Sequence, residues 1–443
     1  MRYQVIRMAK GGQGISTETG KTFFVEGALP GESGDAVVLD EKKSFGRCRA
    51  ISRDNDSIYR CTTDVCPLSQ RCDGCGFRHV RPECALQLKA QAVHAEILKS
   101  AHIPDIPCQL CGISDNALDG TRHRLRLHAT HGKLGFFARG THDIIPAADC
   151  SVITPHLRNA VAWLQNHLPD TRSLSIDIQL DQDSQSTIFA HFRIPESRVL
   201  KKYQHRPGVI KKTQPQEKQS LTFLHKFAQS AIECGVFAGI RIEDQTFGKP
   251  WIKDVVSIDG IQTVSWRRIG DFGQATPCAN AHLHKLVDEF LTHKNYRYIV
   301  DLYAGSGNLS FRAAVRVPSV DAFEFFCDEE AFSLGVRDSS PSWDTNTRVR
   351  LNVCDLSKGL PKSAFQAEAI ICDPARDGLS EAAAADICRS NARELLYISC
   401  EASCLARDLT RLSSAFKPKQ LTYVDMFPQT PLVETVAWLE RVT

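Results

Sequence analysis

Short apolar runs separated by glycine-rich turns mark the first part of the chain. The runs at 5–8, 22–25 and 36–39 are typical of strands, and turn-forming segments at 10–14 and 29–32 separate them. Short strands with such turns are common in small β-barrels. The pattern therefore predicts a barrel at the start of the chain. It is either of the OB type, which often binds single-stranded nucleic acid, or a structural barrel such as an SH3-like one.

The pattern beyond the barrel is mixed and becomes regular only near residue 256. Apolar side chains over 82–101 fall roughly on one face of a helix, and the runs at 175–178 and 187–190 are typical of strands. From about residue 256, strand and helix signals alternate as in a doubly wound α/β domain. We therefore expect a multi-domain protein: an N-terminal OB-like β-barrel over 1–54, a central α+β domain over 55–255 and a C-terminal α/β Rossmann-like domain over 256–443.

The charge and the composition of the chain exclude few classes of protein. The formal net charge is only +3 over 443 residues, and the apolar and charged fractions are those of an ordinary globular protein. A nucleic-acid partner is neither required nor excluded, so local basic segments such as 122–126 and 201–212 must decide. Residues 1–7 lack the apolar core of a signal peptide, and no apolar run has the length of a membrane span. We predict a cytoplasmic protein with no membrane partner and no obligate protein partner.

Three cysteines gather between the barrel and the first predicted helix. Cys66, Cys72 and Cys75 are separated by five and then two residues, and the shorter spacing lets two sulfurs reach one metal centre around a tight turn. Three thiolates need a fourth ligand for tetrahedral zinc or for a four-iron cluster. The spacing favours a metal site over incidental cysteines and leaves zinc and iron–sulfur open. The candidate fourth ligands are Cys61, Cys84, Cys108, Cys111 and Cys150.

A glycine-rich turn in the last third of the chain has the form of a cofactor loop. Residues 299–303 have a buried-strand pattern, and 304–308 lead from it into a helix. The next strand ends in Glu324, which is placed to accept two ribose hydroxyls. The third glycine of the pyrophosphate fingerprint is missing, which favours a mononucleoside such as S-adenosylmethionine over NAD. A second strand end, Asp373-Pro374, strengthens the prediction.

A thiol and a carboxylate near the C-terminus are candidates for chemistry. Cys400 follows a predicted strand and precedes a helix, a position at which thiol pKa values fall. The alternative is a buried structural cysteine. Glu434 interrupts an apolar strand-like run, and its alternative is a solvent-facing position on a half-buried strand. Neither residue is decisive alone.

Together these segments resemble the S-adenosylmethionine-dependent RNA uracil-5-methyltransferase family, and in particular its ribosomal-RNA branch. The resemblance spans nearly the whole chain. Residues 9–14 and 24–32 look like the family's TRAM domain, an RNA-binding OB-like barrel. The most specific matches are at 373–376, at 397–400 with 405–408, and at 426–434.

The resemblance implies roles for individual residues. Cys400 would be the nucleophile and Glu434 the base. The cofactor contacts would be Gln274, Tyr303, Asn308, Glu324, Asp355 and Asp373, although the chain between Glu324 and Asp355 has diverged. The metal site would be a [4Fe-4S] cluster, in preference to zinc, held by Cys66, Cys72, Cys75 and Cys150.

The implied reaction is transfer of a methyl group from S-adenosylmethionine to C5 of a uridine in RNA, with 23S rRNA as the expected substrate. Thiolate attack at C6 would activate C5, and the target base would leave any stack to reach the thiol. A tRNA uracil-5-methyltransferase is the alternative within enzymes, and a catalytically impaired RNA-binding or assembly factor is the alternative outside them.

Three positions depart from the family pattern. Glu401-Ala402 replaces the usual Asn-Pro after the nucleophile, Leu432 replaces a His before the base, and Thr276 replaces an Asn after Gln274. A carboxylate beside the thiol would raise the pKa of that thiol unless it points away. The departures therefore bear on rate and substrate more than on fold.

Overall fold

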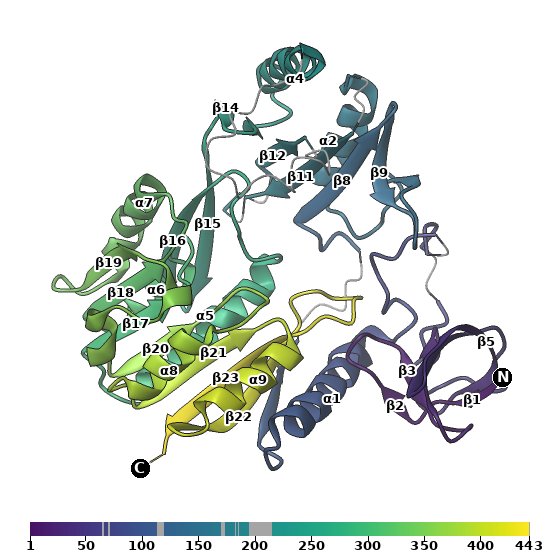
Figure 1. The fold of residues 1–443 in the computed structure, drawn as a ribbon. Helices are drawn as coiled ribbons and strands as arrows, with labels where there is room; N and C mark the ends of the chain where they lie inside the picture. Colours follow the sequence, from purple (N-terminus) through teal and green to yellow (C-terminus); the bar gives the residue numbers. More distant parts are fainter. Residues whose placement is uncertain are drawn as a thin grey trace.

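The computed structural model describes residues 1–63, 66–69, 71–112, 119–169, 173–181, 183–184, 186–194 and 215–442, without the side chains of 215–220. Figure 1 shows an N-terminal sheet, a central sheet with its helices and a C-terminal sheet covered on both faces. Among the described residues, no helix is long and apolar enough to cross a membrane.

The N-terminal sheet curls around its own small core (Figure 1). Its six strands run in the order β1-β5-β6-β4-β3-β2. Alternate side chains such as Tyr3, Phe23, Val25 and Cys48 point inward and are buried together, as expected for strands with one face on a core. The strands are β1 (Arg2–Gln4), β2 (Arg7–Met8), β3 (Gly14–Ser16), β4 (Thr22–Glu26), β5 (Ser33–Glu41) and β6 (Phe45–Ala50).

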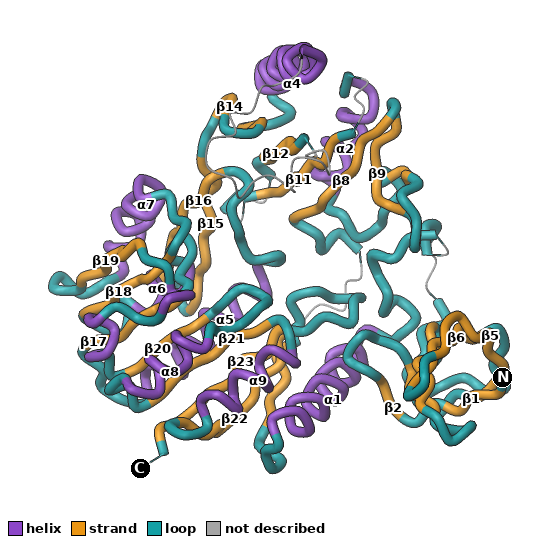
Figure 2. The backbone as a smooth tube through the Cα atoms, viewed as in Figure 1, coloured by secondary structure: helices purple, strands orange, loops and turns teal. Residues whose placement is uncertain are grey.

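The central sheet has seven strands in the order β10-β9-β8-β11-β12-β13-β14, and two helices cover one of its faces (Figure 2). The apolar side chains on that face, such as Leu127, Ile176 and Phe192, pack against the helices. The strands are β8 (Arg124–Thr130), β9 (Lys133–Phe137), β10 (Ile144–Pro146), β11 (Leu174–Leu180), β12 (Ile188–Arg193), β13 (Gly239–Ile242) and β14 (Gln245–Gly248). The helices are α2 (Pro155–His167) and α4 (Pro215–Glu233).

The C-terminal sheet has eight strands in the order β19-β18-β17-β20-β21-β23-β22-β7. Helices α1, α8 and α9 cover one face, and α5 and α6 the other. The strands are β7 (Cys108–Cys111), β17 (Tyr298–Leu302), β18 (Ser319–Glu324), β19 (Arg348–Val353), β20 (Ala369–Cys372), β21 (Glu394–Ser399), β22 (Phe416–Val424) and β23 (Glu434–Arg441). The helices are α1 (Pro82–Ala101), α5 (Pro277–Thr292), α6 (Asn308–Ala313), α7 (Glu329–Ser339), α8 (Glu381–Arg389) and α9 (Ala402–Leu412).

One segment expected in the central domain belongs to the C-terminal sheet. Strand β7 pairs in parallel with β22, and α1 packs on the same face as α9. The apolar face of the helix predicted over 82–101 is therefore buried against the C-terminal sheet. A hairpin, β15 (Trp251–Ile258) and β16 (Ile261–Arg268), connects the central and C-terminal sheets, and the Ser339 hydroxyl of α7 hydrogen-bonds to the backbone of Val264 in β16.

The strand order of the C-terminal sheet has a topological switch point between β17 and β20. The chain runs from β17 outward through β18 to β19 and then returns to β20 on the other side of β17. In open α/β sheets, ligands bind at such a switch point, beyond the carboxyl ends of the strands. The segments that follow β17, β18, β20 and β21 all meet there.

Candidate active site

The loop after β17 has the backbone geometry of a tight strand-to-helix turn. Tyr303 has φ of 62°, and Gly305 and Gly307 also have positive φ. A Cβ at Gly307 would lie 2.5 Å from the Phe311 ring, so only glycine fits there. A Cβ at Gly305 would meet no atom within 4 Å. The loop is therefore packed on the Gly307 side and open on the Gly305 side.

Glu324, at the end of β18, is tied to this loop. Its Oε2 accepts a hydrogen bond from the Gly305 amide at 3.0 Å, and its Oε1 accepts from the amides of Phe325 and Phe326 at 2.7 and 3.0 Å. The parallel β17–β18 pairing brings the two strand ends together. The acid expected to contact ribose thus lies beside the open side of the loop.

Asn308, the first residue of α6, is oriented by two buried residues of α5. Its Oδ1 lies 3.1 Å from Asn280 Nδ2 and 3.0 Å from His284 Nε2, and its own Nδ2 donates to Asn280 Oδ1 at 2.8 Å. Burial lowers the pKa of His284 to about 4, so the ring is neutral at physiological pH. Neither partner was predicted from the sequence, because both look like polar positions on an ordinary helix.

Asp355 lies at the same edge of the sheet, and both of its carboxylate oxygens contact residues that follow it closely in the chain. It precedes a short helical turn, where Oδ1 accepts from the Ser357 amide at 3.0 Å and Oδ2 pairs with Lys358 at 3.2 Å. Burial raises the pKa of Tyr303, and the charges of Glu324 and Asp355 are among the further causes. Asp355 therefore lies within electrostatic reach of the cofactor-type loop.

A third carboxylate of this region, Asp301, is one that the sequence reasoning missed. Its Oδ2 accepts a hydrogen bond from Ser310 Oγ at 2.6 Å, whereas Oδ1 is buried without a hydrogen-bond partner among the described residues. Burial raises the pKa of Asp301 to about 7, and the nearby charges of Asp373 and Glu324 add to the rise. A charged residue inside a buried strand was the available signal. Three acids around one open loop suit a ligand with hydroxyl groups and positive charge.

Asp373 and Gln274 meet at the carboxyl ends of the strands. Asp373 follows β20, and its amide donates to the Leu302 carbonyl at 3.3 Å, which places it beside the loop after β17. Gln274 Nε2 donates to Asp373 Oδ2 at 3.4 Å. The segment before Gln274 rests on the central sheet, where Arg124 and Arg193 donate to the carbonyls of Gly273 and Gly270, each at 3.5 Å.

Cys400 and Glu434 face each other through the antiparallel β21–β23 pairing. Ser399 lies opposite Thr435, so the register brings Cys400 and Glu434 together one position further along. Burial raises the pKa of the Cys400 thiol and Glu434 adds to the rise, whereas a hydrogen bond from Arg376 opposes it. Arg376 was not predicted as a site residue, although it lies in the 373–376 motif.

Two acids lie close to the thiol: Glu434 is buried, and Asp373 is half-buried. Burial raises the pKa of Asp373, while its hydrogen bond with Gln274 opposes the rise. Burial also raises the pKa of Glu434, and the charge of Asp373 raises it further, while Arg376 opposes. The two carboxyl groups and the thiol cannot all carry a negative charge at such close range without a cost in energy. The ionisation of each group therefore depends on the ionisation of the others.

The four predicted cluster cysteines border one core. Cys150 belongs to the core of the central domain, and Cys66, Cys72 and Cys75 pack against it. Burial raises the pKa of Cys75 to about 11, and the charges of Cys150 and Cys72 add to the rise. In the described ranges, however, no three side chains of His, Cys, Asp or Glu lie at positions to hold a metal ion. The structure gathers the thiols without arranging them as a ligand set.

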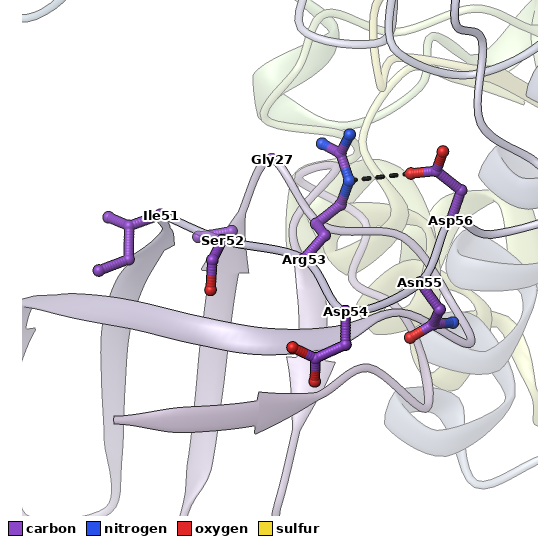
Figure 3. Close-up of a pocket in the computed structure, with 8 residues that line it drawn as sticks. Gly27, Ile51, Ser52, Arg53, Asp54, Asn55 and Asp56 are labelled. Carbon is purple, nitrogen blue, oxygen red and sulfur yellow. Dashed lines mark hydrogen bonds and ion pairs between the residues drawn. The ribbon is translucent and has the colours of Figure 1, made fainter.

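A separate hollow lies on the N-terminal sheet and its exit segment (Figure 3). Its lining includes Gly27 and the run from Ala50 to Asp56, with an ion pair of 3.0 Å between Arg53 Nε and Asp56 Oδ1. It contains none of the predicted site residues. The candidate site residues gather instead at the carboxyl ends of the strands of the C-terminal sheet.

Comparisons with known proteins find similar chains. The model of the family described as tRNA (Uracil-5-)-methyltransferase matches residues 346–442. The 23S rRNA (uracil(1939)-C(5))-methyltransferase of Pseudomonas putida is 27% identical over 99% of this chain and 93% of its own length. Its counterpart in Tolumonas auensis is 27% identical over 97% of this chain and 93% of its own length.

A solved structure shares the whole fold. The tRNA (uracil-54, C5)-methyltransferase of Pyrococcus abyssi, in complex with S-adenosyl-L-homocysteine, has a TM-score of 0.68 and 19% sequence identity, covering 99% of each chain. At that identity the likeness concerns the fold. It extends over the N-terminal, central and C-terminal sheets alike.

Proposed function

We propose that this chain, which is similar to RNA uracil-5-methyltransferases, transfers a methyl group from S-adenosylmethionine to C5 of a uridine in RNA, with Cys400 as the nucleophile and Glu434 as the base. The observation that carries the proposal is the juxtaposition of these two side chains, beside Asp373 and Arg376, at the carboxyl edge of the sheet. A thiol and a base that face each other beside a cofactor-type loop are the parts that this chemistry needs.

The residues around the loop fit S-adenosylmethionine, which supplies the methyl group when bound. The open side of Gly305 leaves room for a ligand, and Glu324 lies next to it to accept ribose hydroxyls. Asp301 Oδ1, which has no hydrogen-bond partner within the described part of the chain, and the carboxylate of Asp373 favour a cationic group. Gln274, Tyr303, Asn308 and Asp355 would complete the binding site.

The chemistry is divided between Cys400 and Glu434. The Cys400 thiolate forms a bond to C6 of uracil, and the electron pair of the C5–C6 double bond moves onto the ring as an enolate. C5 then takes the methyl group. Glu434 removes the proton from C5, the double bond re-forms, and the thiolate leaves C6. A raised pKa suits Glu434 to this task, since its carboxylate, once ionised, is a stronger base than an ordinary glutamate.

Arg376 and Asp373 support these steps. Arg376 donates to the Cys400 sulfur and so favours its thiolate form. Asp373, held by Gln274, lies on the side of the pair nearest the cofactor-type loop. It would orient the uracil ring between the loop and the thiol.

The four clustered cysteines would hold a [4Fe-4S] cluster, with zinc as the alternative. The number and type of side chains suit either, and the thiols share one core, although their positions leave the ligand set incomplete. Cys75 Sγ lies 3.8 Å from Gln429 Oε1 in the loop before Glu434. A cluster would therefore cross-link the central domain close to that loop.

Iron and sulfide analysis of anaerobically purified protein tests for this cluster. About four iron and four sulfide ions per chain support the cluster, and zinc alone selects the alternative. A protein without metal rejects both the cluster and the zinc site.

For the substrate, we infer 23S rRNA, with tRNA as the alternative. The ribosomal-RNA relatives align with nearly the whole chain, and the N-terminal sheet would act as a TRAM-like RNA-binding barrel. Arg126 and Arg193 are partly exposed beside a single carboxylate, Asp177, on the open face of the central sheet. They are candidates for phosphate contacts. The basic segment 201–212 lies outside the described residues.

Nucleoside mass spectrometry tests the reaction and the substrate together. 23S rRNA and tRNA are purified from cells with and without this protein, digested and compared. Loss of 5-methyluridine from 23S rRNA supports the proposal, and loss from tRNA selects the alternative substrate. If neither pool changes, the methyltransferase proposal is wrong and the RNA-binding or assembly factor is favoured.

A further inference from the structure

The N-terminal sheet reaches the catalytic edge through one tight turn. The turn over residues 9–13 is closed by hydrogen bonds between Ala9 and Gln13 and between Gly12 and Ala9, at 2.8 and 2.9 Å. Met8, just before it, is buried with Phe77 in a small core shared with α1. The turn is therefore anchored at its base and presents its tip to the C-terminal sheet.

The tip contacts both segments that carry the reactive side chains. Lys10 Nζ lies 2.6 Å from Glu401 Oε1 and 2.9 Å from Ser403 Oγ. Both of these residues belong to the segment that follows Cys400 in the chain. Gly12 has φ of 84°, and a Cβ there would lie 2.9 Å from Pro431, in the loop that leads to Glu434. In Figure 1 that loop, in yellow, projects from the C-terminal sheet toward the N-terminal one.

Glu401 is the residue that departs from the family pattern beside the nucleophile. Its carboxylate caps α9, accepting from the Ser403 amide at 3.4 Å and from Ser403 Oγ at 2.7 Å. Although burial opposes it, hydrogen bonds from Lys10 and Ser403 lower the pKa of Glu401. The carboxylate is therefore ionised at neutral pH, next in sequence to a thiol that must lose its own proton.

We propose that Lys10 is a positioning residue of the catalytic edge, which pairs with Glu401 and keeps that carboxylate turned away from Cys400. This inference rests on the proposed role of Cys400 as the nucleophile. The N-terminal sheet would thus do more than bind RNA, since it supplies the cation that makes a negative charge beside the thiol tolerable. Without Lys10, the Glu401 charge is uncompensated, and the thiolate of Cys400 is disfavoured.

The charged groups that act on the thiol are Glu434 on β23, and Asp373 and Arg376 after β20. The Lys10–Glu401 pair joins the N-terminal turn to the residue that caps α9. Arg376 favours the thiolate, and the first two acids oppose it. A substitution at Lys10 leaves Glu434, Asp373 and Arg376 unchanged. Its effect therefore reports on the Lys10–Glu401 pair alone.

The test measures the reactivity of Cys400 without RNA. The rate of alkylation by iodoacetamide is followed from pH 6 to 10 by peptide mass spectrometry, with all variants in a C404S background so that the peptide carries one thiol. The variants are K10M, K10R, E401Q and K10M/E401Q. Matching thermal unfolding curves control for folding.

We expect K10M to slow alkylation at pH 7.5 by about two- to fivefold, as one partly solvated charge would, and to move the pH midpoint upward. K10R should behave as the parent, and K10M/E401Q should regain the parent rate, because no charge is left to compensate. An unchanged K10M profile, or a double variant as slow as K10M, would overturn the proposal. A parent protein whose Cys400 alkylates normally but forms no adduct with RNA would instead refute the proposed function.

Discussion

Cys400 and Glu434 lie at facing positions of two neighbouring antiparallel strands, one step beyond the Ser399–Thr435 pair. Facing side chains on such strands are close neighbours. The nucleophile and the base of the proposed reaction are thus positioned by one strand register, although 34 positions separate them in the chain. Strand β23 is antiparallel to its neighbours in an otherwise largely parallel sheet, and only that direction brings the start of β23 to the end of β21.

The first prediction concerns the thiol. C400A should abolish methyl transfer to RNA, because Cys400 is the thiol on which Glu434 and Arg376 act. The matched control is C404A, which removes a thiol one helical turn further along and should keep activity. Methyl transfer from radiolabelled S-adenosylmethionine to RNA measures both. Activity in C400A comparable to that of C404A would contradict the assignment.

E434Q should separate bond formation from product release. The thiol can still attack C6, but the proton at C5 has no acceptor, so turnover should fall by about 10²- to 10⁴-fold while a covalent protein–RNA complex accumulates. The control is E440Q, near the far end of the same strand, where Glu440 only pairs with Lys419 at the surface. Denaturing gels resolve the complex. If E434Q lost activity without accumulating a complex, the role of base would belong to another group.

Glu434 should make stability depend on pH in a defined direction. Its folded-state pKa is raised above the ordinary value of 4.5, so the buried carboxyl favours the folded state fully below pH 4.5 and loses that contribution as the pH rises through the raised pKa. E434Q escapes this loss. Relative to the parent, the thermal midpoint of E434Q should therefore be higher at pH 8.5 than at pH 5. The corresponding gain in the free energy of unfolding is about 1–2 kcal/mol. An equal difference at both pH values would show that the carboxyl is not strained by burial.

Two glycines of one loop should respond oppositely to alanine. G307A would press a methyl group into Phe311 and Phe332, at 2.5 and 2.9 Å, and should destabilise the protein by about 1–3 kcal/mol. G305A has a similar backbone strain but meets open space. It should destabilise the protein less and weaken S-adenosyl-L-homocysteine binding more. Thermal unfolding and calorimetry measure the two effects, and equal binding losses would argue against a ligand on the open side of Gly305.

The sequence predicted the individual segments of the site better than their assembly. The glycine turn, the acid at the end of β18 and the strand before Cys400 could each be recognised, because strand periodicity and turn residues are local signals. The predicted strand runs at 22–25 and 36–39 fall within β4 and β5, whereas that at 5–8 overlaps only the two-residue strand β2.

Long-range contacts were beyond such patterns. Nothing local in residues 82–111 shows that this segment joins the C-terminal sheet, since pairing of β7 with β22 depends on residues more than 300 positions away. The same holds for His284 beside Asn308 and for Lys10 beside Glu401. The Glu401 carboxylate, which departs from the family pattern, is engaged by Lys10 and Ser403.

The central claim is that Cys400 bonds to C6 of a uracil in RNA, and adduct trapping tests it most directly. The protein is incubated with S-adenosylmethionine and fragments of 23S rRNA or tRNA in which 5-fluorouridine replaces uridine. Fluorine at C5 cannot be removed as a proton, so the complex should persist. We predict a methylated RNA adduct on the peptide that contains Cys400, formed with one of the two RNAs and absent in C400A. No adduct with either RNA, or an adduct on another residue, would contradict the mechanism.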